Sequence, residues 1–406
     1  MVINKNHDQQ KNNPEVINHL LTWAVEDIID KSKLVDKLKS GRKLRVKLGI
    51  DPTGKNIHLG RAITLWKLRD FQKAGHKIVL VIGDFTAQIG DPSDKLSKRP
   101  FLSPADIKNN LINYKKQVGK ILDIKKVEWC YNSAWLKKMN FAEVCYLAES
   151  FSVQQMLARR NFKERHEKGE EISVREFLYP LMQGYDSVKI KADLELGGTD
   201  QLFNLQAGRV IQPLYKQPAQ DIMVTAMLEG TDGRKMSTSW GNVININDSP
   251  KDLYGKSMAV RDELIIRYLK LTARLDKNEI DKLEKDLVDG TNPKIVKARL
   301  AFELVKLYCG DKAAQKAAVE FESVHTQGNL PQDIKSFPIP KNQANMILVE
   351  VVYYLGLANS KAEARRLVGQ GGVKVSGVVI KDWQTKITLK SGLVVQVGSR
   401  RFAQFK

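Results

Sequence analysis

The segment "KLRVKLGIDPTG" (43–54) decides the fold. Its first eight residues are rich in strand-forming side chains and end at "DPTG", which is typical of a turn. Next, "GRAITLWKLRDFQKAG" (60–75) spaces its apolar side chains as a helix does and closes with glycine. The run "HKIVLVIGD" (76–84) is short and apolar throughout, which suits a parallel strand covered on both faces. Strand, helix and strand in this order predict a βαβ unit and a doubly wound, Rossmann-like α/β domain with a parallel sheet.

Further along the chain, the pattern changes several times. "DLELGGTDQLFNLQAGRV" (193–210) predicts a strand, a glycine turn and a helix, and "DIMVTAML" (221–228) predicts another strand. A Pro-rich stretch with few apolar residues precedes two short helices and several alternating strands at the C-terminal end. The expected parts are a catalytic α/β domain at 1–244 with a largely helical insert at about 103–190, a helical domain at 245–330, a linker at 331–342 and a small α+β domain at 343–406.

Composition indicates a globular protein with an anionic partner. The 406 residues are 42% hydrophobic and 28% charged, and the formal net charge is +20, which favours nucleic acid over other partners. The three cysteines have no spacing typical of a disulfide framework or a zinc site, so a reducing, cytoplasmic location is expected. The N-terminal segment is polar and the apolar runs are only strand-sized, so neither a signal peptide nor a membrane span is expected.

Two glycine-flanked segments carry groups suited to phosphate. In "GRKMSTSWGN" (233–242), two cations precede three hydroxyl side chains; alone, this is more often a basic surface loop. In "GIDPTGKNIHLGRA" (49–62), His58 and Gly60 stand at a helix start, where free N–H groups and the helix dipole attract anions. A lone histidine there would more often be a cap or a surface residue. Neither segment is a Walker loop or a dinucleotide fingerprint.

Together the two segments resemble the paired motifs of class I aminoacyl-tRNA synthetases. "HLGR" (58–61) is similar to the HIGH motif and "KMSTS" (235–239) to the KMSKS motif, in the same order along the chain. The resemblance extends to the tyrosyl-tRNA synthetases of bacterial type over nearly the whole chain from about Ile17. It implies a ligase that activates L-tyrosine with magnesium-bound ATP and transfers it to tRNA(Tyr). It also implies a homodimer formed through the helical insert, an anticodon-binding role for the helical domain at 245–330, and no metal held by the protein itself.

The helix segment "REFLYPLMQGYDSV" (175–188) carries the implied amino-acid specificity. Tyr179, Gln183 and Asp186 are spaced i, i+4 and i+7, which places them on one helix face, although a half-exposed helix would show the same spacing. In the family, the matching Asp accepts the phenol hydroxyl, and the matching Tyr and Gln reach the α-ammonium. A buried carboxylate without its hydroxyl partner would disfavour phenylalanine.

The resemblance assigns further roles. Asp91 would contact the tyrosine ammonium with Thr86 nearby, Gln201 would take the amino-acid end, and Asp200 would take the ribose hydroxyls of ATP. The residues expected to bind ATP are Gly49, Asp51, His58, Gly60, Gly198, Asp200, Lys235, Ser237 and Thr238. The residues expected to act in catalysis, by positioning and charge stabilisation, are Thr53, His58, Arg61, Arg234 and Lys235.

The basic C-terminal segment resembles the small RNA-binding domain of the S-four type. Its recognisable part is "SKAEARRLVGQGGVKVSGVVIKD" (360–382). The cations expected to meet RNA phosphates are Lys361, Arg365, Arg366 and Lys374. This domain favours the tyrosine enzyme over the related tryptophan enzyme, which typically lacks it.

Three positions depart from the family pattern. Arg61 replaces the second His of HIGH, and Thr238 replaces the second Lys of KMSKS. Lys47 stands where one branch of the family has a Tyr that helps bind the phenol. These changes leave open an alternative function, that of a catalytically weak relative retained as an RNA-binding protein.

Overall fold

The computed structural model describes residues 13–91, 103–236, 240–325, 334–340, 344–398 and 401–406. Ser237 and Thr238, both expected to bind ATP, lie outside these ranges. The chain forms two compact units, one of Met1–Asp248 with Ala259–Leu300 and the other of Ser249–Met258 with Ala301–Lys406.

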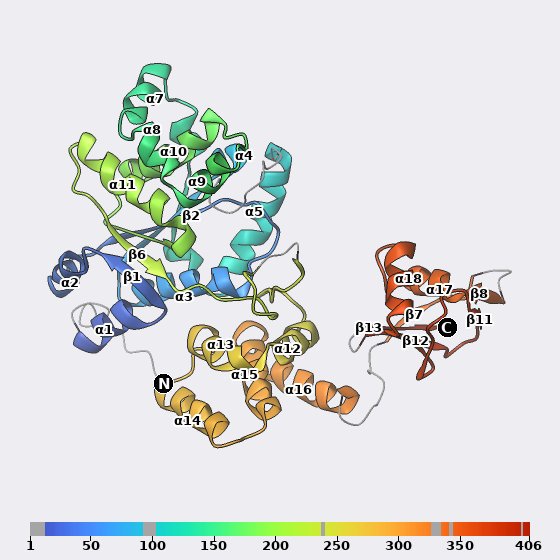
Figure 1. Cartoon of the computed structure of the whole chain (residues 1–406). Helices are drawn as coiled ribbons and strands as arrows, with labels where there is room; N and C mark the ends of the chain where they lie inside the picture. The colour runs from blue at the N-terminus through green and yellow to red at the C-terminus, as the bar shows by residue number, and fades with distance from the viewer. Residues whose placement is uncertain (1–12, 92–102, 237–239, 326–333, 341–343, 399–400) are drawn as a thin grey trace. The chain divides into compact units, whose positions relative to one another are not determined.

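A six-stranded sheet organises the first unit, in the order β1-β6-β5-β2-β3-β4 (Figure 1). Neighbouring strands are parallel except for β1, which is antiparallel to β6. The strands are β1 Val25–Ile29, β2 Arg45–Ile50, β3 Lys77–Ile82, β4 Glu128–Tyr131, β5 Leu194–Gly198 and β6 Asp221–Thr225.

The sheet is doubly wound. From β2 the chain moves outward to β3 and β4, then returns to place β5 on the other side of β2 and β6 beyond it. The strand order therefore reverses between β2 and β5. In open α/β sheets, ligands bind at such a reversal, beyond the carboxyl ends of the two strands.

Helices cover both faces of this sheet. In Figure 1, α3 lies on one side of the sheet and α10 and α11 lie on the other. The helices of the N-terminal part are α1 Pro14–Thr22, α2 Lys31–Lys39, α3 Leu59–Lys73, α4 Thr86–Ile89, α5 Pro104–Val118, α6 Ser133–Leu136, α7 Phe141–Ala148, α8 Val153–Leu157, α9 Arg160–Glu167, α10 Val174–Ile190 and α11 Leu202–Leu214. Those that follow are α12 Pro250–Met258, α13 Ile265–Thr272, α14 Lys277–Val288, α15 Pro293–Cys309 and α16 Asp311–His325.

The close packing of α10 on α11 fixes the position of these two helices at the point where the strand order reverses. At Gly184 of α10, a Cβ would lie 2.9 Å from the backbone oxygen of Ala207 on α11, so only glycine lets the two helices approach this closely. Tyr185, Val188 and Ile211 belong to the buried cluster between these helices. Side chains on the sheet-facing side of α10 are thereby held in fixed positions.

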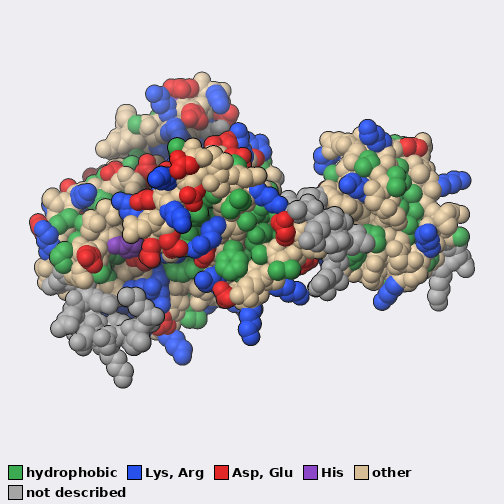
Figure 2. Space-filling view, turned by 90° about the horizontal axis from the view of Figure 1, so that it is seen from below, with side chains coloured by type: hydrophobic (Ala, Val, Ile, Leu, Met, Phe, Trp, Pro, Cys, Tyr) green, Lys and Arg blue, Asp and Glu red, His purple; other side chains and the backbone are tan. Residues whose placement is uncertain are grey.

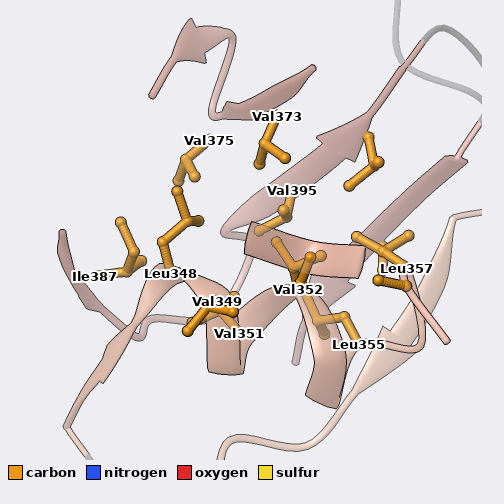
Figure 3. Packing of buried hydrophobic residues seen from close by; sticks show 14 of the residues in the cluster. Leu348, Val349, Val351, Val352, Leu355, Leu357, Val373, Val375, Ile387 and Val395 are labelled. Atoms are coloured by element: carbon orange, nitrogen blue, oxygen red, sulfur yellow. The ribbon is translucent and has the colours of Figure 1, made fainter. Parts of the chain in front are cut away.

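The second unit contains α12 and α16 and a small C-terminal domain. In that domain, α17 Leu348–Tyr354 and α18 Lys361–Gly369 accompany short strands in two small sheets. Figure 3 shows Leu348, Val351 and Val352 packed near Val373 and Val395 in its buried cluster. The strands are β7 Lys335–Phe337, β8 Asn345–Ile347, β9 Val373–Val375, β10 Val378–Val379, β11 Lys386–Thr388, β12 Val394–Val397 and β13 Arg401–Phe405.

The βαβ prediction is confirmed, and the structure adds features that the pattern did not show. The strand-like segment at 126–132 is β4, a member of the main sheet, so the helical excursion between β4 and β5 runs from 133 to 190. Within 331–342, β7 pairs with β13 of the small domain. The helices between 245 and 330 are divided, with α13 and α14 in the first unit and α12 and α16 in the second.

Candidate active site

Asp51 lies directly after β2, at the point where the strand order reverses. Its Oδ1 accepts a hydrogen bond of 2.8 Å from the Thr86 hydroxyl, and its Oδ2 accepts one of 2.8 Å from the Tyr179 hydroxyl. Gly83 is required beside this carboxylate, because a Cβ there would lie 1.8 Å from Asp51 Oδ1. Burial raises the pKa of Asp51 to about 7, although both hydrogen bonds oppose the shift. Two residues expected to bind tyrosine are thus held by one expected to bind ATP.

Asp186, on α10, is buried with two donors. Trp135 Nε1 donates to Oδ1 at 2.8 Å, and Asn132 Nδ2 donates to Oδ2 at 3.3 Å. Burial raises the pKa of Asp186 to about 7, while Lys47 and these two donors favour the ionised form. The carboxylate can accept a further hydrogen bond, such as that of a phenol. Asn132 and Trp135 were not anticipated from the sequence, since they lie near β4, far along the chain from α10.

Below Asp186, Lys47 of β2 and Glu195 of β5 form a wholly buried ion pair, with Nζ 2.9 Å from Oε1. Gln183, on the same helix as Asp186, donates its side-chain amide to Glu195 Oε1 at 3.1 Å. The three residues of the expected helix face, Tyr179, Gln183 and Asp186, therefore all point toward the sheet. The structure brings them together as the spacing predicted.

A second polar cluster surrounds Asp91. Gln201 Nε2 donates to Asp91 Oδ2 at 2.7 Å, and Asn204 Nδ2 donates to Oδ1 at 3.4 Å. Arg159 Nη2 lies 3.6 Å from the same Oδ1, and the Arg159 side chain is 5% exposed. Burial lowers the pKa of this guanidinium, while Asp91 opposes the shift. Arg159 was missed from the sequence, because a cation in a helical segment gives no sign of pointing inward.

The first expected phosphate motif lies beside Met236, in the described part of the second. His58 is the N-cap of α3, with Nδ1 accepting from the Arg61 N–H at 3.4 Å. The Leu59 N–H donates to the Ile244 carbonyl at 2.9 Å, which ties this turn to the segment after the second motif. A Cβ at Gly60 would lie 3.5 Å from the sulfur of Met236, which shows how closely the two motifs approach.

The cations around this junction have protein partners. Lys235 Nζ lies 3.5 Å from Asp200 Oδ2, so the second motif reaches the turn that follows Gly198 at the end of β5. Arg61 Nη1 donates to the Tyr114 hydroxyl at 2.6 Å.

The remaining expected residues are placed less centrally. Arg234 is exposed. It donates to Asp232 Oδ2 at 2.6 and 2.8 Å and lies over the Trp240 ring. Thr53, in the turn after β2, donates its N–H to the Asp51 carbonyl at 2.8 Å, and Gly49 on β2 has no atom near the place of a Cβ.

These groups can bind a zwitterion and polarise a phosphate. Carboxylates serve as acceptors for ammonium and hydroxyl groups, whereas the cations and the α3 N-terminus attract negative charge. Within the described ranges, no group of three or more His, Cys, Asp or Glu could hold a metal ion. The described helices likewise include none that is both long and apolar enough to cross a membrane.

In the small domain, the four cations expected to bind RNA are exposed. Arg365 lies over the Trp383 ring at 4.4 Å, and Arg366 donates to Gln370 Oε1 at 3.3 Å. Lys361 pairs with Glu350, and Lys374 points outward from β9. Figure 2 shows several Lys and Arg side chains and few Asp or Glu on the visible face of this domain.

Comparisons with known proteins identify the family. The model of tRNA synthetases class I (W and Y) matches residues 39–326, and that of the S4 domain matches residues 348–391. The chain is 44% identical to a tyrosine–tRNA ligase of Thermotoga maritima, with 96% of this chain and 97% of the relative covered. It is 42% identical to that of Carboxydothermus hydrogenoformans, with 97% and 98% covered.

Solved structures show the same fold. A C-terminally truncated mitochondrial tyrosyl-tRNA synthetase of Aspergillus nidulans matches with a TM-score of 0.64 at 22% identity, covering 79% of this chain and 98% of that one. A tyrosyl-tRNA synthetase of Archaeoglobus fulgidus, complexed with L-tyrosine, matches with a TM-score of 0.62 at 24% identity, covering 75% and 99%.

Proposed function

Because the chain belongs to the tyrosyl-tRNA synthetases of class I, its reaction is the ATP-dependent joining of tyrosine to tRNA, and we propose how its own residues perform this reaction. The observation that supports the assignment best is the pocket of α10. There, buried Asp186 is held by Trp135 and Asn132 with capacity for one more donor.

The tyrosine side uses acceptors. The phenol hydroxyl donates to Asp186. The α-ammonium is received by Asp91, Tyr179, Gln183 and Gln201. Thr86 lies nearby, and both it and Tyr179 donate to Asp51. An ammonium group has only donors, so a ring of carboxylate and amide oxygens is complementary to it.

The ATP side uses the junction of the two motifs. The tyrosine carboxylate attacks the α-phosphorus of ATP, forming tyrosyl-adenylate and releasing pyrophosphate. His58, Arg61 and Lys235, with the N-terminus of α3, stabilise charge on the phosphate oxygens, and Asp200 takes the ribose. Magnesium enters with ATP, held by the phosphates. The terminal adenosine of tRNA(Tyr) then accepts the tyrosine.

The helical segment between β4 and β5 supports a homodimer. Phe141, Val153 and Val174 are 83%, 58% and 74% exposed, which is high for large apolar side chains. Cover by a second copy would remove this area from water. We also place the protein in the cytoplasm, where its three cysteines, all without disulfides, would stay reduced.

The small domain is assigned to tRNA binding through Arg365 and Arg366. Replacing both with alanine should weaken tRNA(Tyr) binding about tenfold at moderate salt, since each phosphate contact contributes a salt-dependent part of the affinity. Filter binding at several salt concentrations measures this, and tyrosine activation should stay at the wild-type rate. If the affinity for tRNA(Tyr) and its salt dependence are unchanged, the two arginines do not contact the tRNA.

The RNA-binding alternative has no support among the relatives, which are ligases. Exchange of pyrophosphate into ATP, with tyrosine, tryptophan, phenylalanine or no amino acid, tests the enzyme directly. Exchange with tyrosine alone is expected. Absence of exchange in protein that still binds tRNA would favour the alternative and show that Arg61 and Thr238 are not tolerated.

A further inference from the structure

Lys47 and Glu195 face each other across the strand reversal. They are register partners of the parallel strands β2 and β5, and both side chains are 0% exposed. Two full charges in such a position need complete pairing, because an uncompensated buried ion is strongly destabilising. The sequence showed Lys47 only as a departure, since its partner comes much later in the chain.

The ammonium of Lys47 is fully used within the protein. It has three N–H donors, and it lies 2.9 Å from Glu195 Oε1, 2.8 Å from the Gln183 carbonyl and 2.7 Å from Ser187 Oγ. No donor is left for a ligand. Lys47 therefore does not replace a phenol-binding tyrosine by touching the phenol itself.

Glu195 in turn orients Gln183. Its Oε1 accepts from Gln183 Nε2 at 3.1 Å, and its Oε2 accepts from Ser187 Oγ at 3.1 Å and from the Gln220 amide. Because the amide nitrogen of Gln183 is directed to Glu195, its Oε1 is the atom left to receive a substrate donor. An ammonium requires an acceptor there.

Lys47 also acts on Asp186, which lies one turn beyond Gln183 on α10. The groups that face this carboxyl are Asn132 and Trp135 as donors, Lys47 as the cation, and Glu195 as a carboxylate, with Asp51 and Cys130 at longer range. Lys47 is the cation among these groups that favours the charged form of Asp186.

We propose that the Lys47–Glu195 pair is the positioning element for tyrosine recognition in this chain, fixing Gln183 as an acceptor for the ammonium and Asp186 as an acceptor for the phenol. Neither member touches substrate. The inference rests on the proposed tyrosine pocket. It goes beyond that proposal by naming the residues that make Gln183 and Asp186 acceptors.

Reversing the pair tests this polarity. In the double variant K47E/E195K, an ion pair remains, but the carboxylate now lies on the β2 side and the ammonium faces the Gln183 amide. A purely structural pair would leave tyrosine recognition at its wild-type level. If the pair positions the acceptors, the KM for tyrosine should rise at least about tenfold in pyrophosphate exchange, with kcat and the KM for ATP within about threefold of wild type.

The pH profile is a second measurement. The acid limb of kcat/KM for tyrosine should move to higher pH, since a carboxylate at position 47 opposes ionisation of Asp186.

A matched control and a milder variant complete the design. K37M/D221N removes another ion pair, at the amino end of β6, where Lys37 Nζ lies 2.8 Å from Asp221, and its tyrosine KM should stay unchanged. If the reversed pair does not fold, Ser187→Ala removes one acceptor of Lys47 and one donor to Glu195 while keeping both charges. It should raise the tyrosine KM about threefold.

A reversed pair, or Ser187→Ala, with the wild-type KM and pH profile overturns the positioning role. Asp186→Ala and Gln183→Ala distinguish this failure from that of the pocket itself. If they lose tyrosine binding while the pair variants keep it, only the role of the pair is wrong. If all of them bind tyrosine normally, the pocket assignment is wrong as well.

Discussion

The two halves of the proposed active site are built differently. On the tyrosine side, Lys47 and Glu195 are wholly buried and Asp186 has two fixed donors. On the phosphate side, Lys235 and Arg234 are 47% and 62% exposed and pair with Asp200 and Asp232.

This difference indicates two strategies of binding. The tyrosine side is preorganised, so that a substrate lacking the hydroxyl leaves a buried acceptor unsatisfied. On the phosphate side, Lys235 and Arg234 are held by protein carboxylates, so ATP must displace those partners before the cations reach its phosphates. Discrimination therefore belongs to the buried half, whereas stabilisation of developing charge belongs to the exposed half.

The largest effect is expected from Asp186→Ala. This change removes the phenol acceptor, leaves the buried Trp135 N–H without its partner, and removes one of the two hydrogen bonds that the Asn132 amide donates. Losing a hydrogen bond to a charged group and leaving a buried donor unpaired together correspond to about 4 kcal/mol, or about 10³-fold in kcat/KM for tyrosine. Titration calorimetry and pyrophosphate exchange measure the loss. Asp193→Ala, at the amino end of β5, is the control. If the Asp186 variant still binds tyrosine tightly, the assignment of the tyrosine pocket is wrong.

Lys235→Ala tests the phosphate side of the proposed site. The ammonium lost is one that acts on charge developing at the phosphate, so kcat should fall about 10²-fold. Tyrosine affinity, measured by calorimetry without ATP, should remain at the wild-type value because Lys235 pairs with Asp200, which we assign to the ATP side. An equal loss in tyrosine binding would show that the two halves are not independent.

The sequence predicted the scaffold because local patterns specify it. The apolar run of β3 and the turn after β2 are readable in a single segment, and so is the spacing of Tyr179, Gln183 and Asp186 on α10. The antiparallel edge strand β1 was not expected, since its "VEDII" has two exposed acidic residues and pairs on one side only. For the same reason β7, with two of its three residues exposed, was included in a linker.

The partners of the site residues could not be predicted, because they depend on strand register and tertiary packing. Glu195 belongs to a segment that predicted a strand, but only the pairing of β5 with β2 places it opposite Lys47. Arg159 and Trp135 come from the helical segment between β4 and β5, whose path over the sheet has no sequence signal. Gly83 is required only because the Asp51 and Thr86 side chains occupy the place of its Cβ.

The smallest expected effect is a pH dependence confined to the tyrosine half. Burial raises the pKa of both Asp186 and Asp51 to about 7, so both carboxylates become fully available only above that pH. When two groups of pKa about 7 must both be ionised, the active fraction at pH 7 is about a quarter, so kcat/KM for tyrosine should fall about threefold between pH 8 and pH 7.

The same two carboxylates affect stability in the opposite direction: activity rises with pH, whereas the stability of the folded protein falls. Their pKa in the folded protein lies above the ordinary value of 3.8, so the stability that they contribute is present at low pH and is lost as the pH rises through about 7. Asp186→Asn, which carries no charge, should therefore unfold at a higher temperature than the wild type at pH 8 without tyrosine, and this difference should shrink at pH 5. Thermal melts at the two pH values measure it. A melting difference that is the same at both would mean that burial does not oppose the ionisation of Asp186, and the contrast between a buried half and an exposed half would lose its electrostatic basis.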